Sequence, residues 1–314
     1  MTPIMDKQTY LKEYLDFAIK LSKDAGVIIK KAIDKRMKGG QANILLKYDN
    51  PSDLVTETDQ AVEQFIKDRL TNTYPTHRFI GEETMAAGTE TIFTSEPTWI
   101  VDPIDGTTNF VHGYPFVAVS IGLTIDKIPV LGVVYNPLLD ELYSAAKGLG
   151  AFLNQTIPLP LYQSPLIDLS QCLIATEAGS DRSSGVLDKK IDVIHTLLRR
   201  TGGVEAHSIR ATGSAALNMC SVAKGCVDVY WEVGCWEWDV TAAIVILQEA
   251  GGIVVSGDNQ RDESPVNIFS RKYLAIRAAD TKSSQLKIAH QMWDILPDID
   301  ASRPSVPGGF EPLV

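Results

Sequence analysis

Residues 99–109, with the sequence WIVDPIDGTTN, constrain this chain more than any other segment. The apolar, β-branched residues 99–101 predict a buried strand, and Pro103 and the Asp105-Gly106 pair are turn formers. Two carboxylates, a carbonyl and two hydroxyls are therefore expected just past the end of the strand, where they can converge on one point. A bare Asp-Gly pair is more often an ordinary turn, but the full string favours oxygen ligands for a hard cation such as Mg²⁺. The segment predicts a divalent-metal site suited to phosphate chemistry.

Composition limits the classes of partner. The 314 residues carry a net charge of −10, which argues against a nucleic-acid surface or an anionic membrane as the partner but decides little about the substrate. No apolar run approaches the length of a membrane span. Charged residues interrupt the N-terminal segment, which therefore lacks the apolar core of a signal peptide. The four cysteines form no C-x-x-C pair, which indicates free thiols in a reducing compartment: Cys172, Cys220, Cys226 and Cys235. We expect a cytoplasmic protein.

The order of periodic segments predicts two unlike halves. Residues 9–36 and 58–70 have helical spacing, and they precede three consecutive strands expected in an antiparallel sheet, at 116–123, 130–135 and 142–146. After a strand at 173, helices are expected at 186–200, 214–223 and 240–250, an alternation typical of an α/β half. We expect one unit over 1–314, with subregions 1–157 and 158–302. A mobile loop near 41–51 and a disordered tail over 303–314 complete the prediction.

Three other acidic segments are weak signals when each is taken alone. Gly81-Glu82-Glu83 follows a short apolar run and is typical of a solvated turn. Asp59 and Asp239 each stand near the start of an expected helix, where an Asp is usually only a cap. Their combination with the 99–109 segment is more specific than any of them separately.

Taken together and in this order, the G-E-E, D-P-I-D-G-T-T-N-F and W-D segments resemble the inositol monophosphatase family. The likeness runs from about Asp53 to the Ala250-Gly251-Gly252 end of the last segment. It implies an α/β (α+β) fold, the layered αβαβα sandwich of the inositol monophosphatase and sugar phosphatase type. The metals would lie between its two halves.

The resemblance also implies the ligands and the catalytic groups. Glu82, Asp102 and the carbonyl of Ile104 match the ligands of a first Mg²⁺, and Asp105 and Asp239 join Asp102 around a second. Two or three ions per active site are expected. Thr107 and Asp59 match a hydrogen-bonded pair that, with Glu82, orients and deprotonates the attacking water.

The same resemblance implies a substrate pocket drawn from both halves of the chain. Its expected residues are Asp105, Gly106, Thr107, Gly213, Ser214, Ala215, Glu232 and Asp239. Composition alone favours a simple Ser-capped core helix at residues 213–215. A carboxylate at Glu232 favours a polyol substrate over a nucleotide. Lys47 resembles a lysine of a mobile loop near the metals, but residues 39–50 form a longer loop than expected.

The function expected from this set is Mg²⁺-dependent hydrolysis of myo-inositol monophosphates to inositol and phosphate, inhibited by lithium. One alternative keeps the hydrolysis and changes the substrate to galactose 1-phosphate, histidinol phosphate or a nucleotide 3′-phosphate. A metal-binding regulatory protein without turnover is a third possibility, although none of the matched ligands is missing. A homodimer is expected from the resemblance alone.

Overall fold

The computed structural model describes residues 7–38, 44–46, 54–89 and 92–302, with the backbone alone at 7, 44–46, 54 and 55. The predictions made for Lys47 and for the tail 303–314 lie outside the described residues, and so does the predicted loop 41–51 except for Ile44–Leu46, which form a short strand paired with Leu54–Thr56.

The first half of the chain forms a seven-stranded sheet covered by two long helices. The helices are α1 (Lys7–Met37) and α2 (Glu57–Thr73), as the apolar spacing predicts. The sheet has the order β3-β4-β5-β6-β7-β8-β9, with β3 parallel to β4 and every other pair antiparallel. Its strands are β3 (Arg78–Gly81), β4 (Thr98–Asp105), β5 (Ala118–Ile125), β6 (Ile128–Asn136), β7 (Glu141–Ala146), β8 (Gly150–Leu153) and β9 (Ile157–Pro158). Shorter elements are β1 (Ile44–Leu46), β2 (Leu54–Thr56), α3 (Glu82–Ala86) and α4 (Thr107–His112).

The second half forms a mixed five-stranded sheet in the order β11-β10-β12-β14-β13. Its strands are β10 (Leu173–Thr176), β11 (Ser208–Arg210), β12 (Val229–Val233), β13 (Ile253–Ser256) and β14 (Lys272–Ile276). The helices predicted from periodicity are present as α5 (Ser184–Leu198), α6 (Ala215–Lys224) and α7 (Glu237–Glu249), followed by α8 (Lys282–Trp293). A 3₁₀ turn, η2 (Leu169–Gln171), precedes β10.

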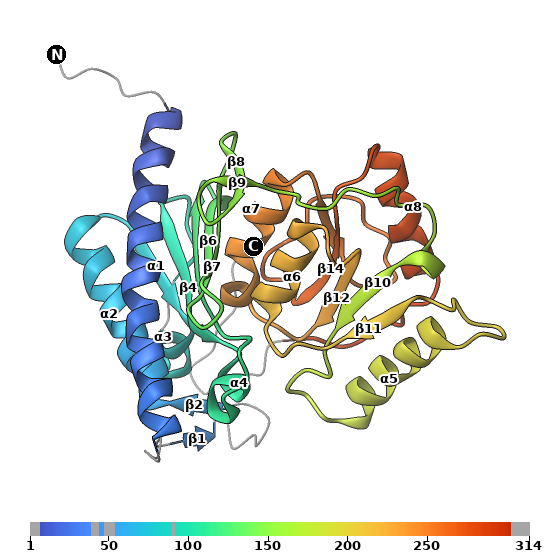
Figure 1. The fold of residues 1–314 in the computed structure, drawn as a ribbon, viewed down its shortest axis with the longest axis horizontal. Helices are drawn as coiled ribbons and strands as arrows, with labels where there is room; N and C mark the ends of the chain where they lie inside the picture. Colours follow the sequence, from blue (N-terminus) through green and yellow to red (C-terminus); the bar gives the residue numbers. More distant parts are fainter. Residues whose placement is uncertain (1–6, 39–43, 47–53, 90–91, 303–314) are drawn as a thin grey trace.

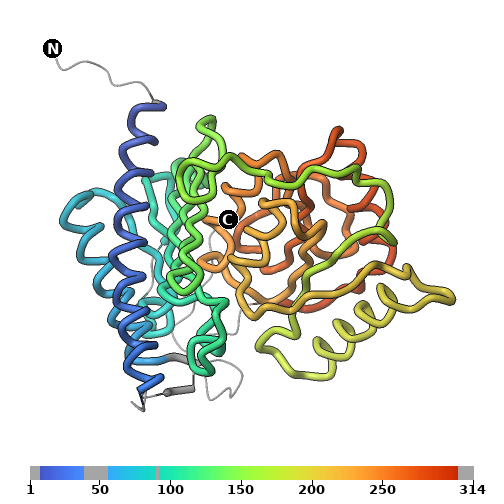
Figure 2. The backbone as a smooth tube through the Cα atoms, in the orientation of Figure 1, coloured from blue at the N-terminus to red at the C-terminus, as the bar shows by residue number. Residues whose placement is uncertain are grey.

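The elements stack in five layers, which confirms the predicted αβαβα sandwich (Figure 1). Helices α1 and α2 cover the outer face of the first sheet, and α5 and α8 flank the second sheet on the far side (Figures 1 and 2). Helices α6 and α7 lie between the sheets, and α7 packs on β4 to β8 as well as on β13. Helix α7 is apolar on nearly every side, as expected for a helix buried from both directions. Residues at its N-terminus therefore face the boundary between the halves.

Strand β4 departs from the sequence prediction. The strand was expected to end before Asp102, but it continues to Asp105. Its pairing with β5 passes from Asp102↔Ser120 directly to Asp105↔Ala118, so Pro103 and Ile104 form a bulge. Proline has no N–H for the ladder and is tolerated at such an irregularity. Because of the bulge, Asp102 and Asp105 both belong to β4, but their side chains leave the strand in different directions.

No helix within the described ranges is both long enough and apolar enough to cross a membrane.

Candidate active site

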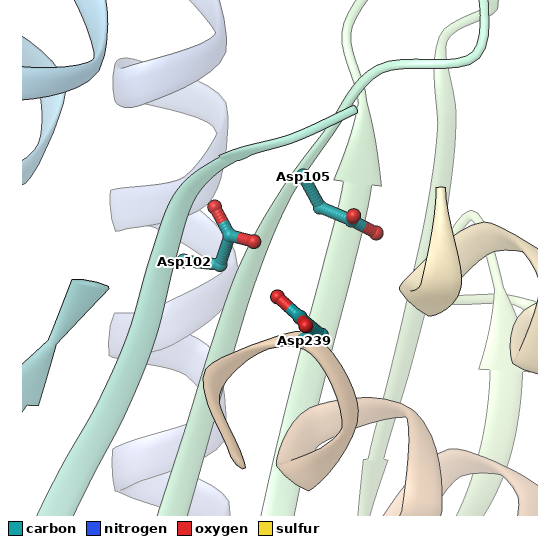
Figure 3. A group of neighbouring side chains, drawn as sticks. All are labelled: Asp102, Asp105 and Asp239. Atoms are coloured by element: carbon teal, nitrogen blue, oxygen red, sulfur yellow. The ribbon is translucent and has the colours of Figure 1, made fainter. Parts of the chain in front are cut away.

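Three buried carboxylates converge where β4 meets the start of α7. Asp102 and Asp105 come from β4 and Asp239 from the first turn of α7 (Figure 3). One carboxylate oxygen of each lies within 4.8 Å of the other two. These three residues were predicted as ligands, and the fold brings them together from positions more than 130 residues apart in sequence. The group is an oxygen-only set that a hard divalent cation prefers.

Burial and the neighbouring negative charges raise the pKa values of these three carboxyl groups. The pKa of Asp102 is raised well above its usual value by burial first, and then by the charges of Glu82, Asp105 and Asp239. Burial likewise raises the pKa of Asp239, with Asp105 and Glu82 adding to it. Asp105 reaches a pKa of about 7 because burial outweighs its hydrogen bonds. A bound cation would offset this cost, so the residues fit a metal ion.

Asp105 is also tied to the second half of the molecule. It accepts hydrogen bonds from Ser214 Oγ at 2.6 Å, from the Ala216 amide at 2.7 Å and from the Ala215 amide at 3.3 Å. Ser214 is the N-cap of α6 and also accepts from the Leu217 amide, as its sequence position predicts. The start of α6 therefore fixes one side of the site.

The predicted Asp59–Thr107 pair is formed. Thr107 Oγ1 lies 3.1 Å from both Asp59 Oδ1 and the Ile104 carbonyl oxygen. Asp59 is fully buried at the third position of α2 and also accepts hydrogen bonds from the amide and the hydroxyl of Thr56, the N-cap. It is therefore more than a helix cap, because the capping arrangement aims its second oxygen at Thr107.

The backbone turns sharply between Ile104 and Thr107. Gly106, the N-cap of α4, has φ +93°, and a Cβ there would stand 2.7 Å from the Phe116 carbonyl oxygen. Only glycine meets both conditions. The turn places Thr107 at the first position of α4 and beside Asp59.

Glu82 reaches the site from α3, and a residue that sequence reasoning missed holds that helix in place. Glu63 on α2 accepts from the Glu83 and Thr84 amides, each at 2.7 Å, and from Thr84 Oγ1 at 2.5 Å. Glu82 lines the cavity but lies outside the tight group of three. Glu63 carries no motif, and its spacing in α2 only predicts a solvated helix face.

A cavity of about 320 Å³ opens beside the carboxylates. Nine of the predicted residues line it, which are Glu82, Asp105, Gly106, Thr107, Gly213, Ser214, Ala215, Glu232 and Asp239. The other three predicted residues, Asp59, Asp102 and Ile104, stand behind this lining and contact it. Contributions come from β4, α3, α4, α6, β12 and α7, so the cavity lies at the boundary between the two halves.

The cavity lining also includes polar residues whose supporting contacts come from distant elements. Glu177 Oε1 accepts from the Thr212 and Gly213 amides at 2.7 and 2.8 Å and from Asn218 Nδ2 at 2.8 Å, which holds the segment before α6. Glu232 on β12 is paired with Lys190 of α5 at 2.7 Å. The Tyr230 hydroxyl has no hydrogen-bond partner among the described residues. None of these supporting roles is visible in the sequence, because each depends on a partner from a distant element.

Comparison with known proteins agrees with this architecture. The model of the inositol monophosphatase family matches residues 10–296. Inositol monophosphatase 2 of Saccharomyces cerevisiae is 45% identical over 272 residues, covering 85% of this chain and 91% of that protein. A Neurospora crassa protein described as quinic acid degradation cluster protein x is 37% identical over 338 residues, covering 97% and 99%. The solved structure of an Anabaena inositol monophosphatase superposes with a TM-score of 0.70 at 28% identity, covering 92% of this chain and 98% of that one. By these matches, the chain belongs to the inositol monophosphatase family and is a phosphatase.

Proposed function

We propose that this phosphatase hydrolyses myo-inositol monophosphates to inositol and phosphate, that it requires Mg²⁺ and that lithium inhibits it. One observation carries the proposal: the cavity beside the buried Asp102, Asp105 and Asp239 group is also lined by the Glu232 carboxylate. The first group suits a cation that binds a phosphate. The second suits the hydroxyls of a polyol.

The metal would be held by the predicted ligands. We assign Asp102, Asp105 and Asp239 to one ion, and Glu82, Asp102 and the Ile104 carbonyl to another. Bound divalent ions neutralise the charge of a phosphate monoester and lower the pKa of water. The support for this assignment is the raised pKa of the three aspartates, because a cation would relieve their repulsion.

The protein's own groups handle the proton of the attacking water. We assign Thr107 Oγ1 as the acceptor of a hydrogen bond from that water, while its own proton is donated to Asp59, 3.1 Å away. The proton released by the water is then shared by Asp59 and Glu82, which act as general bases. The water oxygen attacks phosphorus, the ester P–O bond breaks, and the departing alkoxide takes up a proton to become a hydroxyl.

The phosphate and the alcohol occupy different parts of the cavity in this proposal. The backbone amides of Gly106 and Thr107 stand at the start of α4, where the first amides of a helix have no intrahelical acceptor and can bind phosphate oxygens. Residues 213–215 and Glu232 face the alcohol from the other side.

We also propose that the chain acts as a single phosphatase unit, as a homodimer and in the cytoplasm. The shared core of α6 and α7 between the two sheets supports the single unit. Analytical ultracentrifugation of the purified protein tests the dimer, and fractionation of cells tests the compartment.

A second candidate substrate is a phosphorylated polyol that also carries a carboxylate. Two observations favour it: Arg182 lines the cavity with no ion-pair partner among the described residues, and the Neurospora relative is named for quinic acid degradation. A guanidinium binds a carboxylate well.

Phosphate release by the purified protein tests these candidates. The panel contains inositol 1-phosphate, galactose 1-phosphate, histidinol phosphate, a nucleotide 3′-phosphate and a phosphorylated quinate, each with Mg²⁺, with chelator and with added Li⁺. Preference for inositol 1-phosphate that disappears with chelator supports the proposal. Preference for another substrate leaves the phosphatase activity in place and contradicts only the choice of inositol as the alcohol. If phosphate is released from no member of the panel, the proposal is contradicted.

A further inference from the structure

Helix α5 carries a lysine that is buried against the wall of the cavity. The side chain of Lys190 is 1% exposed, whereas its neighbour Lys189 is exposed. Lys190 Nζ lies 2.7 Å from Glu232 Oε1, 2.6 Å from the Val233 carbonyl oxygen and 3.3 Å from the Glu177 carbonyl oxygen. An ammonium group has three protons, and three acceptors surround this one. Lys190 therefore has no proton left to give to a ligand.

The partner carboxylate is satisfied on one oxygen only. Glu232 Oε1 accepts from Lys190 and also from the Val233 amide at 3.0 Å. Glu232 Oε2 is buried and has no partner among the described residues, although Glu232 lines the cavity. Leaving a buried carboxylate oxygen without a donor is costly. The free oxygen is thus suited to a donor that a ligand supplies.

Lys190 itself does not line the cavity. Gly179 lines the cavity and has φ +76°, and a Cβ on it would stand 2.8 Å from Lys190 Nζ. A larger residue would press on the ammonium group at this close approach. Gly179 and Glu232 line the cavity and Lys190 does not, so Glu232 is the member of the ion pair that a substrate can reach.

We propose that Lys190 is a positioning residue: it holds Glu232 Oε1 so that Oε2 accepts hydrogen bonds from the hydroxyls of the polyol part of the substrate. This inference rests on the proposed function and extends it to a residue outside the predicted site. Burial raises the pKa of the Glu232 carboxyl, the charge of Glu177 adds to the rise, and the charge and hydrogen bond of Lys190 act against it. Lys190 thereby also favours the ionised form, which accepts hydrogen bonds and cannot donate one.

The test compares Lys190→Met with the matched control Lys189→Met, which removes an exposed lysine one residue away on α5. The expected result for Lys190→Met is a KM for inositol 1-phosphate raised about tenfold, the size of a lost hydrogen bond to a charged group, with a much smaller change in kcat. The KM for 4-nitrophenyl phosphate, which has no ring hydroxyls, should rise far less. Lys189→Met should leave both substrates unchanged.

A second pair of variants separates positioning from folding. Because removal of one partner of a buried ion pair destabilises a protein, Lys190→Met can lose stability for that reason alone. Glu232→Gln and the double variant Lys190→Met/Glu232→Gln are therefore compared with each other. If Lys190 acts only through Glu232, the single variant Glu232→Gln and the double variant have the same KM for inositol 1-phosphate. A higher KM in the double variant than in Glu232→Gln overturns the proposal.

The remaining outcomes are distinct. Equal losses on both substrates, or a loss confined to kcat, indicate a merely structural lysine and overturn the positioning role while the proposed function stands. Wild-type protein that hydrolyses 4-nitrophenyl phosphate but no inositol phosphate overturns the proposed function, and with it the role given to Lys190.

Discussion

Replacing Asp102 with asparagine should stabilise the metal-free protein while nearly abolishing hydrolysis. Asp102 is almost fully buried beside Asp105 and Asp239. Asparagine has the same shape and can still accept the hydrogen bond that the Ile104 amide donates to Asp102 Oδ1 at 2.9 Å. The substitution therefore removes a charge without a cavity, and it removes a ligand shared by both proposed metal ions.

The size of the effect follows from the separation of the carboxylates. Two unit charges 4.8 Å apart, the outer limit of the group, repel by about 3.5 kcal/mol at an effective dielectric constant of about 20. A chain of 314 residues has an unfolding entropy of about 0.7 kcal/mol/K, so relief of one such pair raises Tm by about 5 °C. Protonation of the wild type also relieves the repulsion, but it costs about 1.4 kcal/mol for each pH unit above the ordinary pKa.

The sign of the pH dependence follows from the raised pKa values. Folded wild type without metal retains protons on Asp102, Asp105 and Asp239 that the unfolded chain has released. Its stability therefore falls as pH rises from the unfolded value of 3.8 toward the raised folded values, which for Asp105 means about 7. The Tm advantage of Asp102→Asn should grow over the same range.

Thermal unfolding in EDTA and in Mg²⁺, followed by calorimetry at acidic and mildly alkaline pH, measures these effects. Mg²⁺ should raise the Tm of the wild type and leave that of Asp102→Asn nearly unchanged. The matched control is Asp228→Asn, because Asp228 bonds to the buried Arg277 at 2.5 Å and should lose stability when neutralised. If Asp102→Asn lowers the metal-free Tm as Asp228→Asn does, repulsion within the group is not the dominant effect and the reasoning is refuted.

Three further variants test other parts of the site. Thr107→Val removes the hydroxyl that donates to the buried Asp59, so it should lower kcat by about a hundredfold and also lower Tm, because an oxygen of Asp59 loses a donor; near-normal kcat in a steady-state assay would exclude Thr107 from the proton path. Glu232→Gln should raise the KM for inositol 1-phosphate without altering the Mg²⁺ concentration needed for half-maximal rate, and a change in Mg²⁺ requirement alone would contradict its place at the alcohol. Tyr230→Phe removes a buried hydroxyl that has no partner among the described residues, so a calorimetric Tm equal to or above the wild-type value is expected, and a drop of several degrees would reveal an unrecognised partner.

Much of the fold could be predicted from local patterns. The spacing of apolar residues placed α1, α2, α5, α6 and α7, because a helix that covers a sheet must keep one face apolar. The end of β4 was predicted less well. A Pro-containing bulge and a turn have the same local composition, and only the pairing with β5 shows that the strand continues to Asp105.

The sequence by itself determined the local part of the candidate site. Asp102, Ile104, Asp105 and Thr107 lie within six residues, so a strand, a bulge and a helix start suffice to present their oxygens together. Asp239 could also be predicted from its local sequence, because it is the third residue of α7 and the start of a helix fixes the direction of that side chain.

Only the tertiary structure decided how these groups are supported. Glu63 holds α3, the start of α6 binds Asp105, and Lys190 is buried on Glu232, 42 residues away. In the sequence, Glu63 and Lys190 look like solvated charges on helices. Whether a charge is buried depends on the free energy of removing it from water, and that cost is met only by partners from other elements, which the packing of the layers brings into contact.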